Sequence, residues 1–290
     1  MSDKGNGEMP TGVTAAGDAK TGSPPPSLPL RALIPTAITM LALCSGATGV
    51  RFAITGEFEK AAAAIVIAGL LDGIDGRVAR LLRGTSRFGA ELDSLSDVTA
   101  FGIAPALILY LWALEDLGRF GWVVALSLAV CCALRLARFN TSLDQEDLPK
   151  QRLGFTTGVP APAGAGMAML PLFWSLANDN SLDSDPHLRA IITAVVVAIT
   201  AFLMVSSLPG WGFKAVRVPR NARLFVLAGV GLFAASLAQA PWMTLFVTAG
   251  AYAVAFPFAS VRYARLRRDA QASAASFTPP EEPPAPVPPA

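Results

Sequence analysis

Hydrophobic residues form eight long stretches in this chain, separated by short polar segments. Each stretch has about 17–25 residues, the length that an α-helix needs to cross the hydrocarbon core of a bilayer. We therefore predict an all-α integral membrane protein, a polytopic bundle of eight transmembrane helices. The predicted spans are residues 33–53, 61–82, 92–114, 120–138, 156–177, 188–207, 222–240 and 243–262.

The two ends of the chain lack such stretches. Residues 1–28 are rich in Gly, Pro, Ser and Thr, and the chain ends in a proline-rich run, FTPPEEPPAPVPPA. Such compositions favour disorder over a packed core. We predict a disordered N-terminal tail at 1–28, one transmembrane domain at 29–268, and a disordered C-terminal tail at 269–290. The N-terminal tail has no apolar core of a signal peptide, so we expect none to be removed.

Composition agrees with a membrane protein. The 290 residues are 53% hydrophobic and 15% charged, and the mean hydropathy of +0.49 is high for a soluble domain. The cysteines Cys44, Cys131 and Cys132 lie in apolar runs, so we expect buried thiols and no disulfide framework. A single histidine gives almost no support for a mechanism based on imidazole.

Basic residues are distributed unevenly across the predicted membrane. All but four of the 23 Lys and Arg residues fall on one side, the exceptions being Arg51, Lys60, Arg119 and Arg189. Loops rich in Lys and Arg stay in the cytoplasm. We therefore predict a multi-pass protein of the cell (inner) membrane, with both termini in the cytoplasm.

Four aspartates interrupt the hydrophobic pattern where the second predicted span ends and the third begins. The stretch from Asp72 to Asp97 reads DGIDGRVARLLRGTSRFGAELDSLSD. Asp72 and Asp75 fall on one face of a helix, and Asp93 and Asp97 on one face of the next. Gly84 supplies a helix stop between them. We predict that the two faces meet across a tight turn, on the cytoplasmic surface of the membrane.

Any one of these aspartates alone would be an ordinary solvated charge at a helix end. Four that converge repel one another and are costly near the membrane. Their hard oxygen atoms suit Mg²⁺ or Mn²⁺, and two such ions suit in-line displacement at a phosphorus atom. We predict two divalent cations as cofactors, with four aspartate ligands: Asp72, Asp75, Asp93 and Asp97.

Small and basic residues accompany the aspartates. Gly76, Ala79 and Gly89 leave room for a ligand to approach the backbone, and Arg80 shares the face of Asp72 and Gly76. We predict these four residues as substrate-binding.

Arg135 and Arg138 end the fourth predicted span at the depth of the aspartates. Such a pair can simply extend its charges to the membrane surface. It can also bind a phosphate or carboxylate through paired hydrogen bonds. We predict both arginines as substrate-binding.

The spacing D-x2-D-G-x2-A-R-x8-G-x3-D-x3-D resembles the signature of the CDP-alcohol phosphotransferase family at every position. The resemblance implies that the four aspartates hold two metals and that Asp97 also serves as general base. The runs ELDSLSDVTAFGIAPA and ALRLARFN are similar to the phosphatidylserine synthase branch of that family. The run GFTTGVPAPA is also similar, although Val159 and Ala161 depart from the residues expected there.

This resemblance implies an enzyme that transfers the phosphatidyl group of CDP-diacylglycerol to the hydroxyl of L-serine and releases CMP. Gly76 and Ala79 would then let the nucleotide lie against the helix, and Arg80 would pair with phosphate. The expected partners are these two substrates and membrane lipids, with no nucleic acid. The resemblance also implies a homodimer.

Two other functions stay open. A related transferase would use another acceptor, such as inositol phosphate, glycerol phosphate or choline, and the aspartate signature alone does not separate these. A metal-ion transporter would use the aspartates as a relay across the membrane. Their place at the membrane surface rather than at mid-depth argues against a transporter.

Overall fold

The computed structural model describes residues 30–82, 87–143, 155–179, 181–206, 209–211 and 223–275. The predicted N-terminal tail lies outside these residues, as do Gly84 and the part of the C-terminal tail beyond residue 275.

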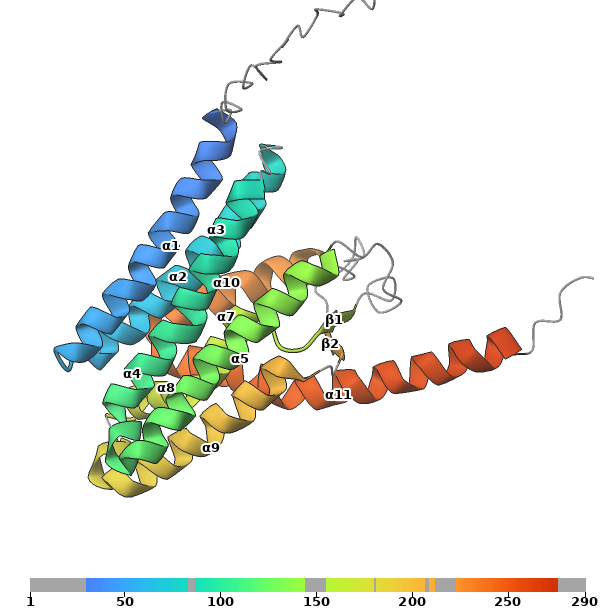
Figure 1. The fold of residues 1–290 in the computed structure, drawn as a ribbon. Coiled ribbons are helices and arrows are strands. Elements are labelled where there is room, and N and C mark those ends of the chain that lie inside the picture. Colours follow the sequence, from blue (N-terminus) through green and yellow to red (C-terminus); the bar gives the residue numbers. More distant parts are fainter. Residues whose placement is uncertain are drawn as a thin grey trace, which may run out of the picture.

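Helices occupy every predicted hydrophobic stretch (Figure 1). The first two stretches form α1 (Leu30–Ile54) and α2 (Phe58–Leu81). The third forms three consecutive segments, α3 (Arg87–Asp97), η1 (Val98–Ile103) and α4 (Ala104–Trp112). The short turn η2 (Leu114–Leu117) leads to the fourth, α5 (Arg119–Leu143). The other four form α7 (Ala161–Ala168) with α8 (Leu170–Ala177), then α9 (Pro186–Val205) after the turn η3 (Ser181–Ser184), α10 (Arg223–Gln239) and α11 (Pro241–Ala275). Helix α11 thus continues past residue 268, where the predicted transmembrane domain ends.

Five of these segments are long and apolar enough to cross a membrane. They are Leu33–Ile54, Phe88–Trp112, Arg119–Thr141, Pro186–Val205 and Pro241–Phe258. Of the other segments, α2 carries charges toward both ends, α7 and α8 are separate short helices, and α10 is shorter. The chain is a helical multi-pass membrane protein, and its predicted count of eight spans stays a prediction.

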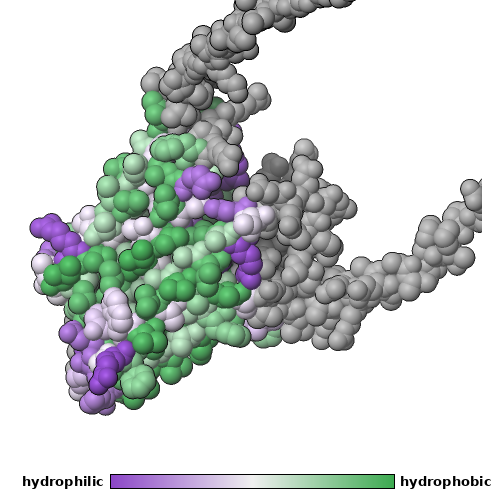
Figure 2. Space-filling model, in the orientation of Figure 1, coloured by the Kyte–Doolittle hydropathy of each residue, from purple (hydrophilic) through white to green (hydrophobic). Residues whose placement is uncertain are grey.

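Large hydrophobic side chains cover the outside of the bundle. Figure 2 shows hydrophobic residues over most of the visible flank. On α9, for example, one face presents four exposed side chains, Ile191, Val195, Ile199 and Phe202. A surface of this kind is unfavourable in water and fits the hydrocarbon of a bilayer. The prediction that all three cysteines are buried is confirmed for Cys132, but Cys131 is only half-buried and Cys44 is exposed on this outer surface.

Helix α1 approaches α2 and η1 closely at small residues. A Cβ atom added to Gly46 would lie 2.8 Å from the Cα atom of Ala100, and one added to Gly49 would lie 3.2 Å from the carbonyl oxygen of Ala61. Glycine permits backbones to come this near, as in many membrane helix pairs. Helix α1 therefore packs against both chain segments that carry the aspartates.

Charged pairs lie at the other end of these helices. Glu57 in the turn before α2 pairs with Lys60, and this hydrogen bond lowers the pKa of Glu57 below its usual value. Arg189 of α9 donates a hydrogen bond of 3.3 Å to Asp116 of η2. Since Asp72 lies on α2 about 20 Å along the helix from Glu57, the aspartates and these pairs mark opposite ends of the bundle.

A short antiparallel strand pair is the exception to the helical fold within the described residues. Strand β1 (Phe155–Thr157) follows α5, and β2 (Pro209–Trp211) follows α9. Gly158 ends β1 with a φ of +72°, a left-handed conformation that favours glycine. The helical span predicted from residue 156 is therefore wrong at its start, and helix α7 begins only at Ala161.

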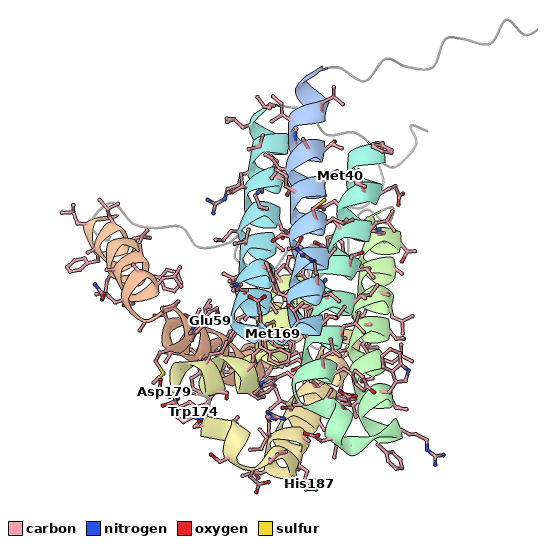
Figure 3. The ribbon with its side chains drawn as sticks, turned by 90° about the vertical axis from the view of Figure 1, so that its left-hand side faces the viewer. Met40, Glu59, Met169, Trp174, Asp179 and His187 are labelled. Atoms are coloured by element: carbon pink, nitrogen blue, oxygen red, sulfur yellow. The ribbon has the colours of Figure 1, made fainter. Side chains whose placement is uncertain are left out.

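Helix α11 packs against α7 and α8. The indole Nε1 of Trp242 donates a hydrogen bond of 3.2 Å to Glu59 of α2, and the ring of Trp242 stacks on Phe173 of α8. Figure 3 shows Glu59 and Met169 in this region, with α10 extending away from the other helices. The C-terminal helices thus close the bundle beside α2.

Candidate active site

The aspartates of α2 and α3 meet, as the helical spacing predicts. One carboxylate oxygen from each of Asp72, Asp75 and Asp93 lies within 4.8 Å of the other two. Asp97, one turn beyond Asp93, shares a side-chain hydrogen bond with Asp72. Two helices that are joined by a short segment therefore bring all four carboxyl groups to one place.

This donor set fits divalent cations. Carboxylate oxygens are hard ligands of the kind that Mg²⁺ and Mn²⁺ prefer. Asp72 and Asp97 lie close enough to interact, and because ionised carboxylates repel one another, a bound cation is the usual way to hold such groups together. Asp72, Asp75 and Asp93 would form the core of the metal site, with Asp97 beside it.

Helix α1 supplies a residue that fixes one of these carboxylates. The hydroxyl of Thr39, which is only 5% exposed, donates a hydrogen bond of 2.7 Å to Oδ2 of Asp75. The hydroxyl of Ser96 in α3 donates to the backbone carbonyl of Thr39 at 3.1 Å. These buried contacts connect α1, α2 and α3 around the carboxylates. They orient Asp75 in the way that residues hydrogen-bonded to a metal ligand orient that ligand in other proteins.

Space is open beside α2 next to the aspartates. Among the described residues, no atom lies within 4 Å of a Cβ atom added to Gly73 or Gly76. Arg80 lies one turn further on, and its Nε donates a hydrogen bond of 2.9 Å to the carbonyl oxygen of Gly76. Ala79 and Gly89 are both half-buried. The small residues of α2 therefore leave room for a ligand that approaches the aspartates from this side.

The two arginines of α5 have different surroundings. Nε of Arg135 is buried and has no hydrogen-bond partner among the described residues, and its guanidinium interacts electrostatically with Asp97. Arg138 donates hydrogen bonds to the backbone carbonyls of Val205 (2.8 Å) and Ser206 (3.2 Å) at the end of α9. Arg135 thus interacts electrostatically with one of the aspartates, Asp97, whereas Arg138 joins α5 to α9.

The backbone changes its helical form directly after Asp97. Segment η1 is a π-helix with Ala100, Phe101 and Gly102 buried. A Cβ atom added to Gly102 would lie 3.0 Å from Cβ of Cys132 on α5. A π-helical turn inserts an extra residue and is frequent at functional sites. Here it changes the register between Asp97 and the apolar helix α4 that follows.

Comparison with known proteins agrees with this geometry. A family model described as CDP-alcohol phosphatidyltransferase matches residues 32–206, more than half of the chain. The chain belongs to the CDP-alcohol phosphatidyltransferase family. A second model, described as CDP-alcohol phosphatidyltransferase 2, matches residues 221–257. The family likeness thus reaches α10 and α11, beyond the motifs that carry it in the sequence.

Curated members of the family are similar over most of the chain. The chain is 40% identical over 227 residues to the CDP-diacylglycerol–serine O-phosphatidyltransferase of Mycobacterium tuberculosis (strain ATCC 25618 / H37Rv), which covers 78% of both chains. It is 34% identical over 226 residues to the Helicobacter pylori (strain J99) protein of that name, covering 77% of this chain and 88% of that one. For the Bacillus subtilis (strain 168) protein of that name, identity is 33% over 181 residues, covering 62% and 91%.

Some residues of this family site escape sequence reasoning. Thr39 gives no signal, because one threonine in an apolar helix is ordinary and its partner Asp75 lies 36 positions away. Asn140 closes the run ALRLARFN, and its Nδ2 donates a hydrogen bond of 2.9 Å to Oγ of Ser94, between Asp93 and Asp97. The likeness of this run to the phosphatidylserine synthase branch was the one feature of the sequence that could have pointed to Asn140 as a site residue.

Proposed function

We propose that this protein is a CDP-diacylglycerol–serine O-phosphatidyltransferase. The observation that carries the proposal is the convergence of carboxylates from α2 and α3, with Asp72, Asp75 and Asp93 within 4.8 Å of one another. The names of the curated relatives supply the substrates, CDP-diacylglycerol and L-serine. The apolar exterior of the bundle suits a donor whose acyl chains lie in the membrane.

In this proposal, Asp72, Asp75, Asp93 and Asp97 bind two divalent cations, Mg²⁺ or Mn²⁺. When bound, the cations neutralise the pyrophosphate of the donor and stabilise the charge on the leaving CMP. Asp75 is held for this task by the hydroxyl of Thr39.

Asp97 acts as the general base. Its carboxylate takes the proton from the serine hydroxyl as that oxygen attacks the phosphorus bearing the diacylglycerol. A new P–O bond to serine forms, the P–O bond to CMP breaks, and CMP leaves. Asp97 suits this role because it lies beside the group of Asp72, Asp75 and Asp93 rather than within it, and interacts electrostatically with Arg135.

The remaining predicted residues bind and orient the substrates. Gly76 and Ala79 let the nucleotide lie against α2, Arg80 pairs with phosphate, and Gly89 gives access from α3. Arg135 holds a phosphate or the serine carboxylate, which would provide the partner that its buried Nε lacks among the described residues. Arg138 completes the set from the end of α5, where its bonds to the α9 carbonyls also fix its position.

The proposal includes the placement of the site. Eight helices cross the cell membrane with both termini and the aspartates on the cytoplasmic side, where CDP-diacylglycerol and serine are supplied. The protein works as a homodimer, as the family resemblance implies.

An acceptor panel tests this function. Purified full-length protein is given CDP-diacylglycerol and Mg²⁺ with L-serine, glycerol 3-phosphate, inositol phosphate or choline, and lipid products and CMP are measured. We expect phosphatidylserine and CMP in equal amounts with serine, and little product with the other acceptors. Efficient transfer to another acceptor with none to serine would move the protein to a different branch of the family.

A further inference from the structure

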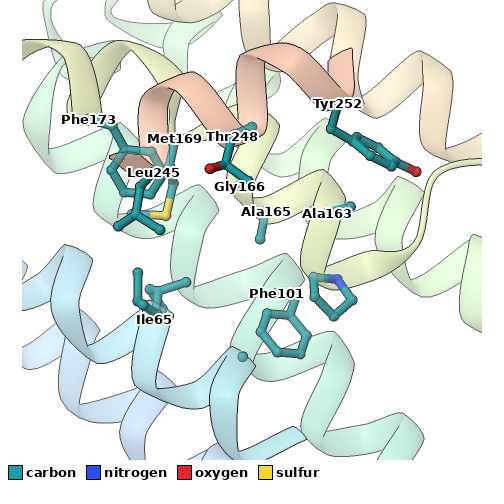
Figure 4. Close-up of a pocket in the computed structure, with 14 residues that line it drawn as sticks. Ile65, Phe101, Ala163, Ala165, Gly166, Met169, Phe173, Leu245, Thr248 and Tyr252 are labelled. Carbon is teal, nitrogen blue, oxygen red and sulfur yellow. The ribbon is translucent and has the colours of Figure 1, made fainter. Parts of the chain in front are cut away.

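An apolar cavity of about 300 Å³ lies between α2, η1, α7, α8 and α11 (Figure 4). Its volume is at the lower end of the range for small-molecule sites, about 300–1,000 Å³. Figure 4 shows Tyr252 and Phe101 at one end, and Phe173 and Leu245 at the other. Small residues, among them Gly69, Ala165 and Gly166, line the space between.

The end of the cavity at Phe101 adjoins the candidate active site through both aspartate-bearing segments. Gly69 lies three residues before Asp72 on the same face of α2, and Phe101 lies four residues after Asp97. A Cβ atom added to Gly69 would lie 3.7 Å from the ring of Phe101, so these two residues form one wall. One helical turn, about 5 Å, thus separates the carboxylates from an apolar space.

Polar groups gather at this same end. The hydroxyl of Tyr252 is buried and has no hydrogen-bond partner among the described residues, and the same is true of Nε of Arg135. The side chains of Tyr252 and Arg135 interact electrostatically, and Arg135 interacts with Asp97 as well. A ligand that fills the cavity therefore meets Tyr252, with Arg135 near it, at one end and, apart from Thr248, only apolar side chains beyond them. An anionic head with a hydrocarbon chain has this form.

The cavity also reaches the surface that faces lipid. Thr248 both lines the cavity and is exposed on α11, inside the candidate span Pro241–Phe258. A chain in the bilayer can enter there without crossing water.

We propose that this cavity holds one acyl chain of the nucleotide-activated diacylglycerol while its pyrophosphate lies at the aspartates. This inference rests on the proposed function and adds to it the place where the acyl chain binds. It also gives Tyr252 a role, because its hydroxyl donates a hydrogen bond to an ester or phosphate oxygen of the bound lipid. The cavity end at Phe173 and Leu245 sets the chain length that fits.

The cavity acts on chain selection more than on overall affinity. Lipid tails are as apolar as the cavity wall, so moving a chain from bilayer to protein removes little hydrocarbon from water. The gain comes from close packing, which is lost when chain and cavity lengths differ. A change of cavity length should therefore alter the ratio of kcat/KM between long-chain and short-chain donors.

Gly166→Leu tests this directly. An added Cβ atom at Gly166 meets only Cβ of Ala249, at 3.8 Å, among the described residues, so the side chain can enter the cavity without a backbone clash. The measurement is kcat/KM for CDP-dioleoylglycerol and for CDP-dihexanoylglycerol, in micelles of one detergent with saturating serine. We expect the long-to-short ratio to fall about tenfold or more, the scale of a misfit in an apolar pocket.

Gly229→Leu on α10 is the matched control, because a Cβ atom there contacts no described atom within 4 Å. It should leave the ratio unchanged. Leu245→Ala is the opposite test, since it lengthens the cavity and should raise the ratio. This second variant decides the question if Gly166→Leu does not fold.

The outcomes separate this inference from the proposed function. If the wild-type protein forms no phosphatidylserine, the proposed function is wrong. If the wild type is active and neither cavity variant changes the ratio relative to Gly229→Leu, a bulk membrane lipid fills the cavity or nothing does. In that case the inference alone is overturned.

Discussion

At the residue scale, the site depends on how four acidic groups are kept together. Asp75 is 4% exposed and bound by Thr39, whereas Asp97 is bound to Asp72 and faces Arg135. These different contacts suit different roles, because a fixed carboxylate serves as a ligand and one at the edge of the group can exchange a proton. Substitutions at these positions should therefore have different effects.

Asp97→Asn and Asp72→Asn separate the base from the ligands. If Asp97 is the base, Asp97→Asn should keep CDP-diacylglycerol binding and lose turnover by about 10²–10⁴-fold, the usual scale for loss of a general base. Asp72→Asn should weaken both metal and donor binding. Steady-state rates and donor binding are measured for both variants over a range of Mn²⁺ concentrations. Near-normal turnover by Asp97→Asn would refute the base, and rescue by Mn²⁺ alone would make Asp97 a ligand only.

Thr39→Val tests the positioning of Asp75. The substitution keeps the shape of the side chain but removes the donor to Oδ2, so the Mg²⁺ concentration for half-maximal rate should rise about 10–100-fold, as for other residues that orient metal ligands. Thr39→Ser should retain most of the affinity. Thr48→Val on the same helix is the control, since Thr48 bonds only to a carbonyl of its own helix among the described residues. Equal metal dependence of Thr39→Val and Thr48→Val would remove Thr39 from the account.

At the element scale, close packing of α1 sets the position of both aspartate-bearing segments. The contact of Gly46 with Ala100 leaves no room for a side chain. Helix α1 carries no aspartate, yet it fixes α2 through Thr39 and η1 through Gly46. The arrangement of α2 and α3 thus depends on a helix that the aspartate motif does not include.

Gly46→Leu should therefore disturb the site without touching it. Overpacking at such a contact costs about 1–3 kcal/mol, so the variant should unfold at a lower denaturant concentration and turn over more slowly. Gly231→Leu is the control, because its Cβ atom meets nothing within 4 Å among the described residues. Unfolding is followed by circular dichroism in detergent. Equal stability of the two variants would show that α1 and η1 do not pack as described.

Much of this arrangement could be predicted from sequence, for definite physical reasons. The apolar stretches gave the positions of the helices because membrane helices need a minimum length, and the aspartate spacing gave the shared faces because helices repeat every 3.6 residues. The hydrogen bond of Thr39 to Asp75 and the π-helix η1 depend on tertiary packing, which has no local pattern. The strand β1 was missed, although Gly158 and Pro160 mark a break that hydropathy alone does not register.

At the scale of the whole molecule, the charge distribution predicts how the bundle is oriented in the membrane. Cysteines placed at Ser181 and at Arg83, in a background without Cys44, Cys131 and Cys132, test this orientation. An impermeant maleimide added to intact cells should label the cysteine at Ser181 and not that at Arg83, because we predict the arginine-rich side to lie in the cytoplasm. Detergent-opened cells provide the control in which both react. The reverse pattern would place the aspartates outside the cell.

The central claim is that the carboxylates of α2 and α3 use divalent cations to transfer a phosphatidyl group to serine. The most direct measurement follows phosphatidylserine and CMP from purified protein, CDP-diacylglycerol and labelled serine, before and after chelation. We predict equal amounts of both products with Mg²⁺ or Mn²⁺, none in excess EDTA, and full recovery when the metal is restored. Undiminished formation of phosphatidylserine in excess EDTA would contradict the account.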